Sequence, residues 1–107
     1  MTVPPELPIA CNLDAMNAEQ RIRHQLLWQQ LAAAREEIRE LADGYGFRLP
    51  ANPAIVSLAA AWMTLEQLCC PFFQFDLRLT AAQGPVWLEL TGREGVKQLL
   101  QTELGLR

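Results

Sequence analysis

Residues 52–71 read NPAIVSLAAAWMTLEQLCCP and indicate one helix that is buried on most of its sides. Asn52 suits the N-cap, and Pro53 suits the first helical position because the N–H that proline lacks has no helical partner there. Over residues 54–69, apolar side chains occupy most faces, which is typical of a central helix rather than an amphipathic surface helix. Pro71 ends the helix, since the residue before a proline is pushed out of the helical backbone region.

Strands are expected on both sides of this helix, because apolar and polar residues alternate there. Before the helix, residues 45–49 alternate and Pro50 stops the strand. After the helix, residues 73–80 alternate cleanly, 81–85 form a turn, and 86–91 alternate again. This second pattern predicts an antiparallel hairpin.

A long helix is expected nearer the N-terminus, from Ala18 to Ala42, with Asn17 as N-cap and Asp43-Gly44 as the stop. Its apolar seam repeats at alternating spacings of four and three: Leu27, Leu31, Ala34, Ile38 and Leu41. Such a helix would be about 37 Å long. A compact domain of this size has a radius of gyration of only about 13 Å. We therefore expect part of the helix to overhang the core or to pack on a second copy of the chain, and we favour the homodimer.

The last helix is predicted from a capping box, Thr91 with Glu94, and is closed by Gly105. At the other end, the proline-rich residues 1–16 are expected to form an extended N-terminal arm. The order helix-strand-helix-strand-strand-helix predicts a single α+β domain over residues 1–107. In it, a small three-stranded antiparallel or mixed sheet packs with the helices.

Composition narrows the function classes. The chain has 107 residues, half of them hydrophobic, with nine basic and twelve acidic side chains and a net charge of −3. Nucleic acids and anionic membranes are therefore not expected partners, because both need concentrated positive charge. The longest uncharged stretch, residues 49–65, is interrupted by prolines and falls short of a spanning helix. The first residues lack the features of a secretory signal, which predicts a cytoplasmic protein.

The three cysteines carry the chemistry of the sequence. They are Cys11, Cys69 and Cys70, an odd number that fits no self-contained disulfide framework. Neighbouring cysteines are also poorly placed to bridge each other, because their Cα atoms lie about 3.8 Å apart, short of the usual disulfide range. Reduced thiols are therefore expected.

Two adjacent thiols form a compact pair of soft ligands, suited to Zn²⁺ or another thiophilic metal or metalloid ion. Glu66 precedes Cys69 and Cys70 by three and four residues, so its carboxylate shares their side of the helix. Cys11 and His24 could complete the shell by folding back, or a second subunit could contribute. His24 lies three residues before Leu27, on the seam of the first helix. The candidate metal ligands are thus Cys69, Cys70, Cys11, His24 and Glu66, although Cys-Cys is not the usual spacing of a structural zinc site.

Two alternatives stay open. In the first, the cysteines only fill the joint between helix and strand, and the protein is a non-enzymatic homodimeric interaction or structural module. The long first helix and Trp87 would form its contact surface. In the second and weaker one, Cys70 serves a thiol-dependent enzyme with Glu66 or His24 as its proton partner. A helix C-terminus and a nearby carboxylate both oppose thiolate formation, so the electrostatics favour a ligand over a nucleophile. We assign no catalytic residue and no certain cofactor.

The segment over 65–75, LEQLCCPFFQF, followed by GPVWLELTG at 84–92, resembles a group of small uncharacterised bacterial proteins. These share a Glu-x-x-Cys-Cys-Pro-Phe core and a following strand, and the resemblance covers the C-terminal half of the chain. It implies no activity. It does imply that the following five residues belong to one motif: Glu66, Cys69, Cys70, Pro71 and Phe75.

Overall fold

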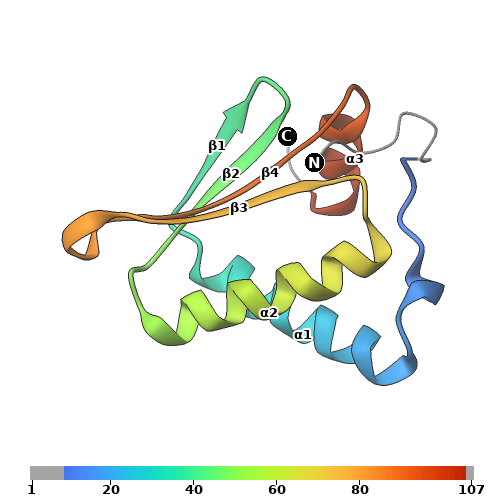
Figure 1. Ribbon diagram of the computed structural model, residues 1–107, viewed down its shortest axis with the longest axis horizontal. Coiled ribbons are helices and arrows are strands. Elements are labelled where there is room, and N and C mark those ends of the chain that lie inside the picture. Colours follow the sequence, from blue (N-terminus) through green and yellow to red (C-terminus); the bar gives the residue numbers. More distant parts are fainter. Residues whose placement is uncertain (1–8, 106–107) are drawn as a thin grey trace.

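Four antiparallel strands form one sheet in the order β1-β2-β4-β3 in the computed structural model, which describes residues 9–105 (Figure 1). The strands are β1 (Glu37–Leu41), β2 (Gly44–Leu49), β3 (Gln74–Leu79) and β4 (Val86–Thr91). The helices are α1 (Ala18–Ala34), α2 (Pro53–Cys69) and α3 (Val96–Glu103). Single 3-10 turns cover Leu13–Ala15 and Ala81–Gln83. The α+β class is confirmed, but the sheet has four strands rather than three and is purely antiparallel.

Helix α2 forms where the sequence predicts it. The Asn52 side chain accepts the N–H of Ala54 at 2.8 Å, and Pro53 opens the helix. At the other end, the N–H of Cys70 still donates to the Glu66 carbonyl at 2.8 Å, but Cys70 itself has left the helical region. The break before Pro71 therefore places Cys69 on the helix and Cys70 just beyond it.

The first helix is shorter than expected. Asn17 and Gln20 form the capping box, but α1 ends at Ala34 and residues 37–41 form the edge strand β1. The prediction of a helix to Ala42 was wrong because β2 offers an otherwise unpaired backbone edge, which β1 satisfies. At 17 residues α1 is about 25 Å long, so the length argument for a second copy no longer holds.

The C-terminal boundary also differs from the expected one. Thr91 ends β4 instead of capping a helix, and the N-cap of α3 is Gly95, whose φ of +99° favours glycine. The predicted capping box with Glu94 was therefore wrong. Gly105, at φ +65°, follows the last helix as expected. Of the predicted extended arm over 1–16, residues 1–8 lie outside the described residues.

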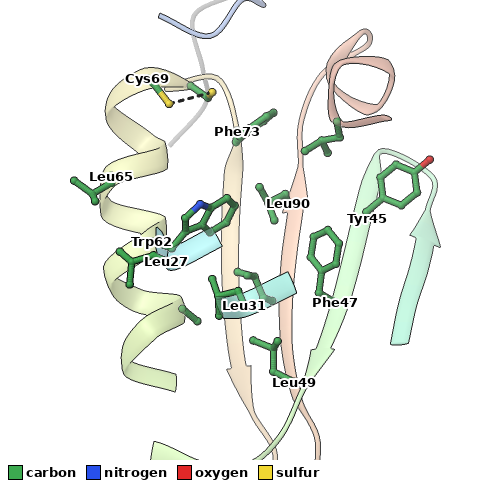
Figure 2. Packing of buried hydrophobic residues seen from close by; sticks show 14 of the residues in the cluster. Leu27, Leu31, Tyr45, Phe47, Leu49, Trp62, Leu65, Cys69, Phe73 and Leu90 are labelled. Carbon is green, nitrogen blue, oxygen red and sulfur yellow. Dashed lines mark hydrogen bonds between the residues drawn. The ribbon is translucent and has the colours of Figure 1, made fainter. Parts of the chain in front are cut away.

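Helices α1 and α2 pack side by side beneath the sheet, and α3 contacts β2 (Figure 1). The strand register aligns Phe47, Leu88 and Leu77 across β2, β4 and β3. Figure 2 shows Trp62 of α2 and Phe47 of β2 within the resulting core, both at most 2% exposed. Among the described residues, no helix is long and apolar enough to cross a membrane.

Candidate functional site

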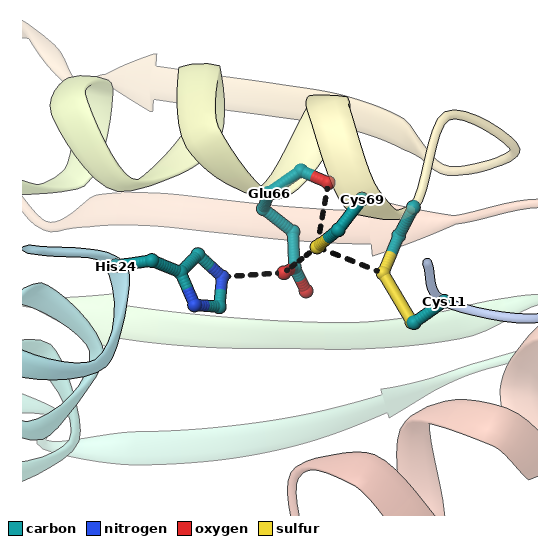
Figure 3. Close-up of a disulfide and its surroundings, with 5 residues drawn as sticks. Cys11, His24, Glu66 and Cys69 are labelled. Atoms are coloured by element: carbon teal, nitrogen blue, oxygen red, sulfur yellow. Dashed lines mark hydrogen bonds and ion pairs between the residues drawn. A yellow bond between two sulfur atoms is a disulfide. The ribbon is translucent and has the colours of Figure 1, made fainter. Parts of the chain in front are cut away.

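The chemistry of the chain gathers where α2 ends (Figure 3). Glu66 and Cys69 share one side of this helix because they are three residues apart. His24 reaches them from α1, and Cys11 reaches them from the segment before α1. The structure thus brings together all five residues selected from the sequence as candidate ligands: Cys11, His24, Glu66, Cys69 and Cys70.

Cys11 and Cys70 form a disulfide, with their Cα atoms 4.7 Å apart. Beside it, the N–H of Asn12 donates to the Cys69 carbonyl at 2.8 Å and holds the N-terminal segment along the helix end. The expectation that all three thiols are reduced was therefore wrong. An odd number of cysteines excludes complete pairing, but it does not exclude one bridge with a free thiol left over. Cys69 is that free thiol, and it is buried.

One oxygen of Glu66 serves two partners. Oε1 lies 2.7 Å from Nε2 of His24 and 3.4 Å from Sγ of Cys69. The Glu66 residue is only 5% exposed, and a carboxylate so far from water needs such partners. Sγ of Cys69 also lies 3.5 Å from the Glu66 carbonyl oxygen and 3.5 Å from Sγ of Cys70. A continuous chain of polar contacts therefore runs from His24 to the disulfide.

The buried position beside Glu66 keeps the Cys69 thiol protonated. Its burial, the negative charge of Glu66 and the hydrogen bond from the thiol to that carboxylate together raise the pKa of Cys69 from 9.0 to about 12. At neutral pH the side chain is therefore a neutral thiol and a poor nucleophile. The sequence predicts the effect of Glu66. Burial, the largest cause, is visible only in the fold.

A cavity of about 400 Å³ opens onto this cluster. Three of its lining residues are His24, Glu66 and Cys69, the three that could hold a metal ion through ligand atoms within 4.8 Å of one another. Cys11 and Cys70 also line it, but their sulfurs are bonded to each other. The aromatic rings of Trp28 and Trp62 contribute further walls. We call His24, Glu66 and Cys69 the ligand cluster.

Trp62 also lines this site, although the sequence alone indicates only a role in packing or in a dimer contact. Its ring stacks on that of His24 with 6.1 Å between centroids. Its buried Nε1 has no hydrogen-bond partner among the described residues. The signal that could have found it was its spacing, because Trp62 lies one helical turn before Glu66. The Cys11–Cys70 pairing had no comparable local signal.

No protein-family model, curated protein or solved structure matches the chain. The resemblance to bacterial proteins with a Glu-x-x-Cys-Cys-Pro-Phe core therefore stays a prediction, and function has to be argued from the site itself.

Proposed function

We propose that the cavity at the end of α2 binds a thiophilic divalent cation, Zn²⁺ or a softer relative such as Cd²⁺. The ligand cluster of His24, Glu66 and Cys69 would hold it. The observation that carries the proposal is the approach of three different ligand atoms to within 4.8 Å of one another at one cavity. Imidazole, carboxylate and thiolate are the three ligand types that zinc takes in proteins.

The present distances suit such an ion with little movement. Zinc bond lengths in a tetrahedral site put a sulfur and an oxygen ligand about 3.6 Å apart, and a nitrogen and an oxygen ligand about 3.4 Å apart. Sγ of Cys69 and Oε1 of Glu66 are already 3.4 Å apart. Nε2 of His24 and the same oxygen are 2.7 Å apart. Binding would therefore require His24 to withdraw from Glu66 by less than about 1 Å and to lie about 3.6 Å from the Cys69 sulfur, which is within 4.8 Å of it now.

Charge also supports a cation. Glu66 supplies one negative charge, and the ion draws the proton from Cys69 to supply a second, which together balance a divalent ion. Three protein ligands would leave the fourth position of a tetrahedral ion without a protein ligand. A water molecule or a small ligand would occupy that position.

The test is titration of the oxidised chain with Cd²⁺, followed by the thiolate-to-cadmium absorbance and by competition with a chromophoric chelator. We expect one ion per chain and a loss of affinity of more than about 10-fold in Cys69→Ala, since even outer-sphere changes cost that much. Glu103→Gln is the matched control, because Glu103 lines the same cavity but lies outside the ligand cluster. Unchanged affinity in Cys69→Ala would contradict the proposal.

The homodimeric, non-enzymatic interaction module remains a second candidate. Cys69 and Cys70 are each only 1% exposed, as expected of packing residues. Trp87, expected at the contact with a second copy, is only 7% exposed and does not offer such a surface. Ile22 and Leu26 of α1 are 63% and 54% exposed and could meet a second copy instead. Light scattering at micromolar concentration tests this, because a dimer has twice the chain mass of 12.0 kDa.

The cytoplasm remains the proposed location. In that compartment thiols are kept reduced, so the Cys11–Cys70 disulfide would serve a redox role there rather than a purely structural one. The thiol-enzyme alternative has less support, since the pKa of Cys69 is raised to about 12 and Cys70 is already bonded to Cys11.

A further inference from the structure

We infer that the Cys11–Cys70 disulfide is a thiol–disulfide exchange centre: an external thiol attacks Cys11, and opening of the bond releases Cys70 into the cation site. The attack of an external thiol on Cys11 is argued from the disulfide and its surroundings alone. The second half, the gain of a ligand, rests on the proposed function.

The two sulfur-bearing residues differ in access. Cys11 is partly exposed and lies in a segment without helix or strand, whereas Cys70 is 1% exposed. Both line the cavity, so a small thiol that enters it meets the disulfide. Arg21 lines the same cavity together with Glu66 and Glu103, so charge gives an incoming thiolate no advantage there and access alone distinguishes the two sulfurs. Because access decides which sulfur is attacked, the nucleophile is expected to bond to Cys11.

The reaction needs two equivalents of an external thiol such as glutathione. The first thiolate bonds to Sγ of Cys11, the Cys11–Cys70 bond breaks, and Cys70 leaves with the electron pair and takes a proton from solvent. The second thiolate attacks the external sulfur of the mixed disulfide and releases Cys11. The external thiols are oxidised to their disulfide, and Cys11 and Cys70 are reduced.

The released sulfur appears beside the ligand cluster. Sγ of Cys70 lies 3.5 Å from Sγ of Cys69 (Figure 3). Two thiolates on one tetrahedral zinc ion lie about 3.8 Å apart, so the two cysteines can share an ion with little rearrangement. The oxidised site offers three ligands and an open position. The reduced site offers four, the number of a closed zinc site.

The first experiment locates the attack. The oxidised 107-residue chain is treated with glutathione, quenched in acid, unfolded, alkylated with iodoacetamide and digested with trypsin. Trypsin places Cys11 on peptide 1–21 and both other cysteines on peptide 49–78. We expect glutathione on peptide 1–21 and two alkyl groups on peptide 49–78. Glutathione on peptide 49–78 would overturn the inference. The inference would also be overturned if glutathione opened the Cys11–Cys70 disulfide in the urea-unfolded chain but not in the folded chain.

The second experiment measures the gained ligand with Cd²⁺ and needs no reductant. Cys11→Ser leaves Cys70 free and mimics the open state, whereas its matched control Cys11→Ser/Cys70→Ser leaves only the ligand cluster. We expect Cys11→Ser to bind Cd²⁺ at least tenfold more tightly and with stronger thiolate absorbance. Equal binding by the two variants would overturn the gain of a ligand. If neither variant nor the wild type binds Cd²⁺ while glutathione still adds to Cys11, the proposed function fails and the exchange centre stands.

Discussion

His24 on α1 and Glu66 on α2 meet through a contact of 2.7 Å between Nε2 and Oε1, across 42 residues of sequence. The His24 side chain is 18% exposed and that of Glu66 is 7% exposed. This contact joins the two helices that cover the sheet, and it points the carboxylate at Cys69. It therefore links the packing of the helix pair to the geometry of the candidate site.

Replacing His24 should destabilise the fold, because the buried carboxylate of Glu66 would lose a hydrogen-bonding partner. We expect His24→Phe, which keeps a ring beside Trp62, to lower the free energy of unfolding by about 2 kcal/mol, because the buried Glu66 carboxylate keeps only its Cys69 partner. In a Glu66→Gln background the same substitution should cost less than about 1 kcal/mol, since no charge is left unpaired. Urea denaturation measures all four proteins.

Glu36→Gln is the control for that cycle. It breaks the ion pair with Arg48, in which both side chains are more than 40% exposed, and should cost no more than about 0.5 kcal/mol. Equal losses from His24→Phe in both backgrounds would mean that ring packing, rather than the charge of Glu66, accounts for the effect.

The disulfide should contribute strongly to stability because it closes a long loop. Its two cysteines are 59 residues apart, and the chain-entropy relation for such a loop gives about 4 kcal/mol. The double variant Cys11→Ser/Cys70→Ser should unfold with about that much less free energy in urea. Intact mass supplies the direct check, since the native chain should lack two hydrogens relative to the reduced chain. A loss below about 1 kcal/mol would contradict the expectation.

How far the sequence predicts the fold depends on how local each signal is. Helix α2 follows from Asn52, Pro53 and Pro71, whose effects act within a few residues. Strand β1 was missed because residues 35–42 are good helix formers and continue the seam of α1. Asp43-Gly44 was read as a helix stop, but Asp43 lies in the turn between β1 and β2 and Gly44 begins β2, positions that suit the same residue types.

The candidate site was predictable as a set of residues but not as a bonding pattern. Glu66 and Cys69 belong together by helical spacing, and His24 was selected from the seam of α1. The bridge from Cys11 to Cys70 depends on how the N-terminal segment folds back over the end of α2. The spacing of the cysteines in the sequence does not predict that the N-terminal segment folds back in this way.

Two glycines of β2 provide a test of the sheet register. A Cβ on Gly44 would overlap the Leu90 carbonyl oxygen and lie 2.8 Å from Cα of Thr91, so Gly44→Ala must push β4 away. A Cβ on Gly46 would meet only side-chain atoms, the nearest at 3.4 Å on Trp87. We expect Gly44→Ala to cost more than about 2 kcal/mol and Gly46→Ala less than about 1 kcal/mol in urea denaturation. Similar costs for both would contradict the β2–β4 pairing.

Stability should fall at alkaline pH because of Cys69. Its pKa is about 12 in the folded chain and 9.0 as an ordinary thiol, so between these values the unfolded chain has lost a proton that the folded chain retains. The free energy of unfolding contributed by this group is therefore fully present below pH 9.0 and declines as the pH rises towards 12. Urea denaturation at pH 8, 9.5 and 11 should show this decline in the wild type.

Cys69→Ala provides the comparison, because it keeps the Cys11–Cys70 bridge and removes only the titrating thiol. Other groups that titrate in this range act on both proteins, so the stability difference between them isolates Cys69. From pH 9.5 to 11, the free energy of unfolding of the wild type should fall steadily relative to that of Cys69→Ala. Tryptic mapping should confirm that the disulfide is unchanged in each sample. A difference that is constant with pH would mean that the Cys69 thiol titrates alike in the folded and unfolded chains, and that neither its burial nor Glu66 holds its proton.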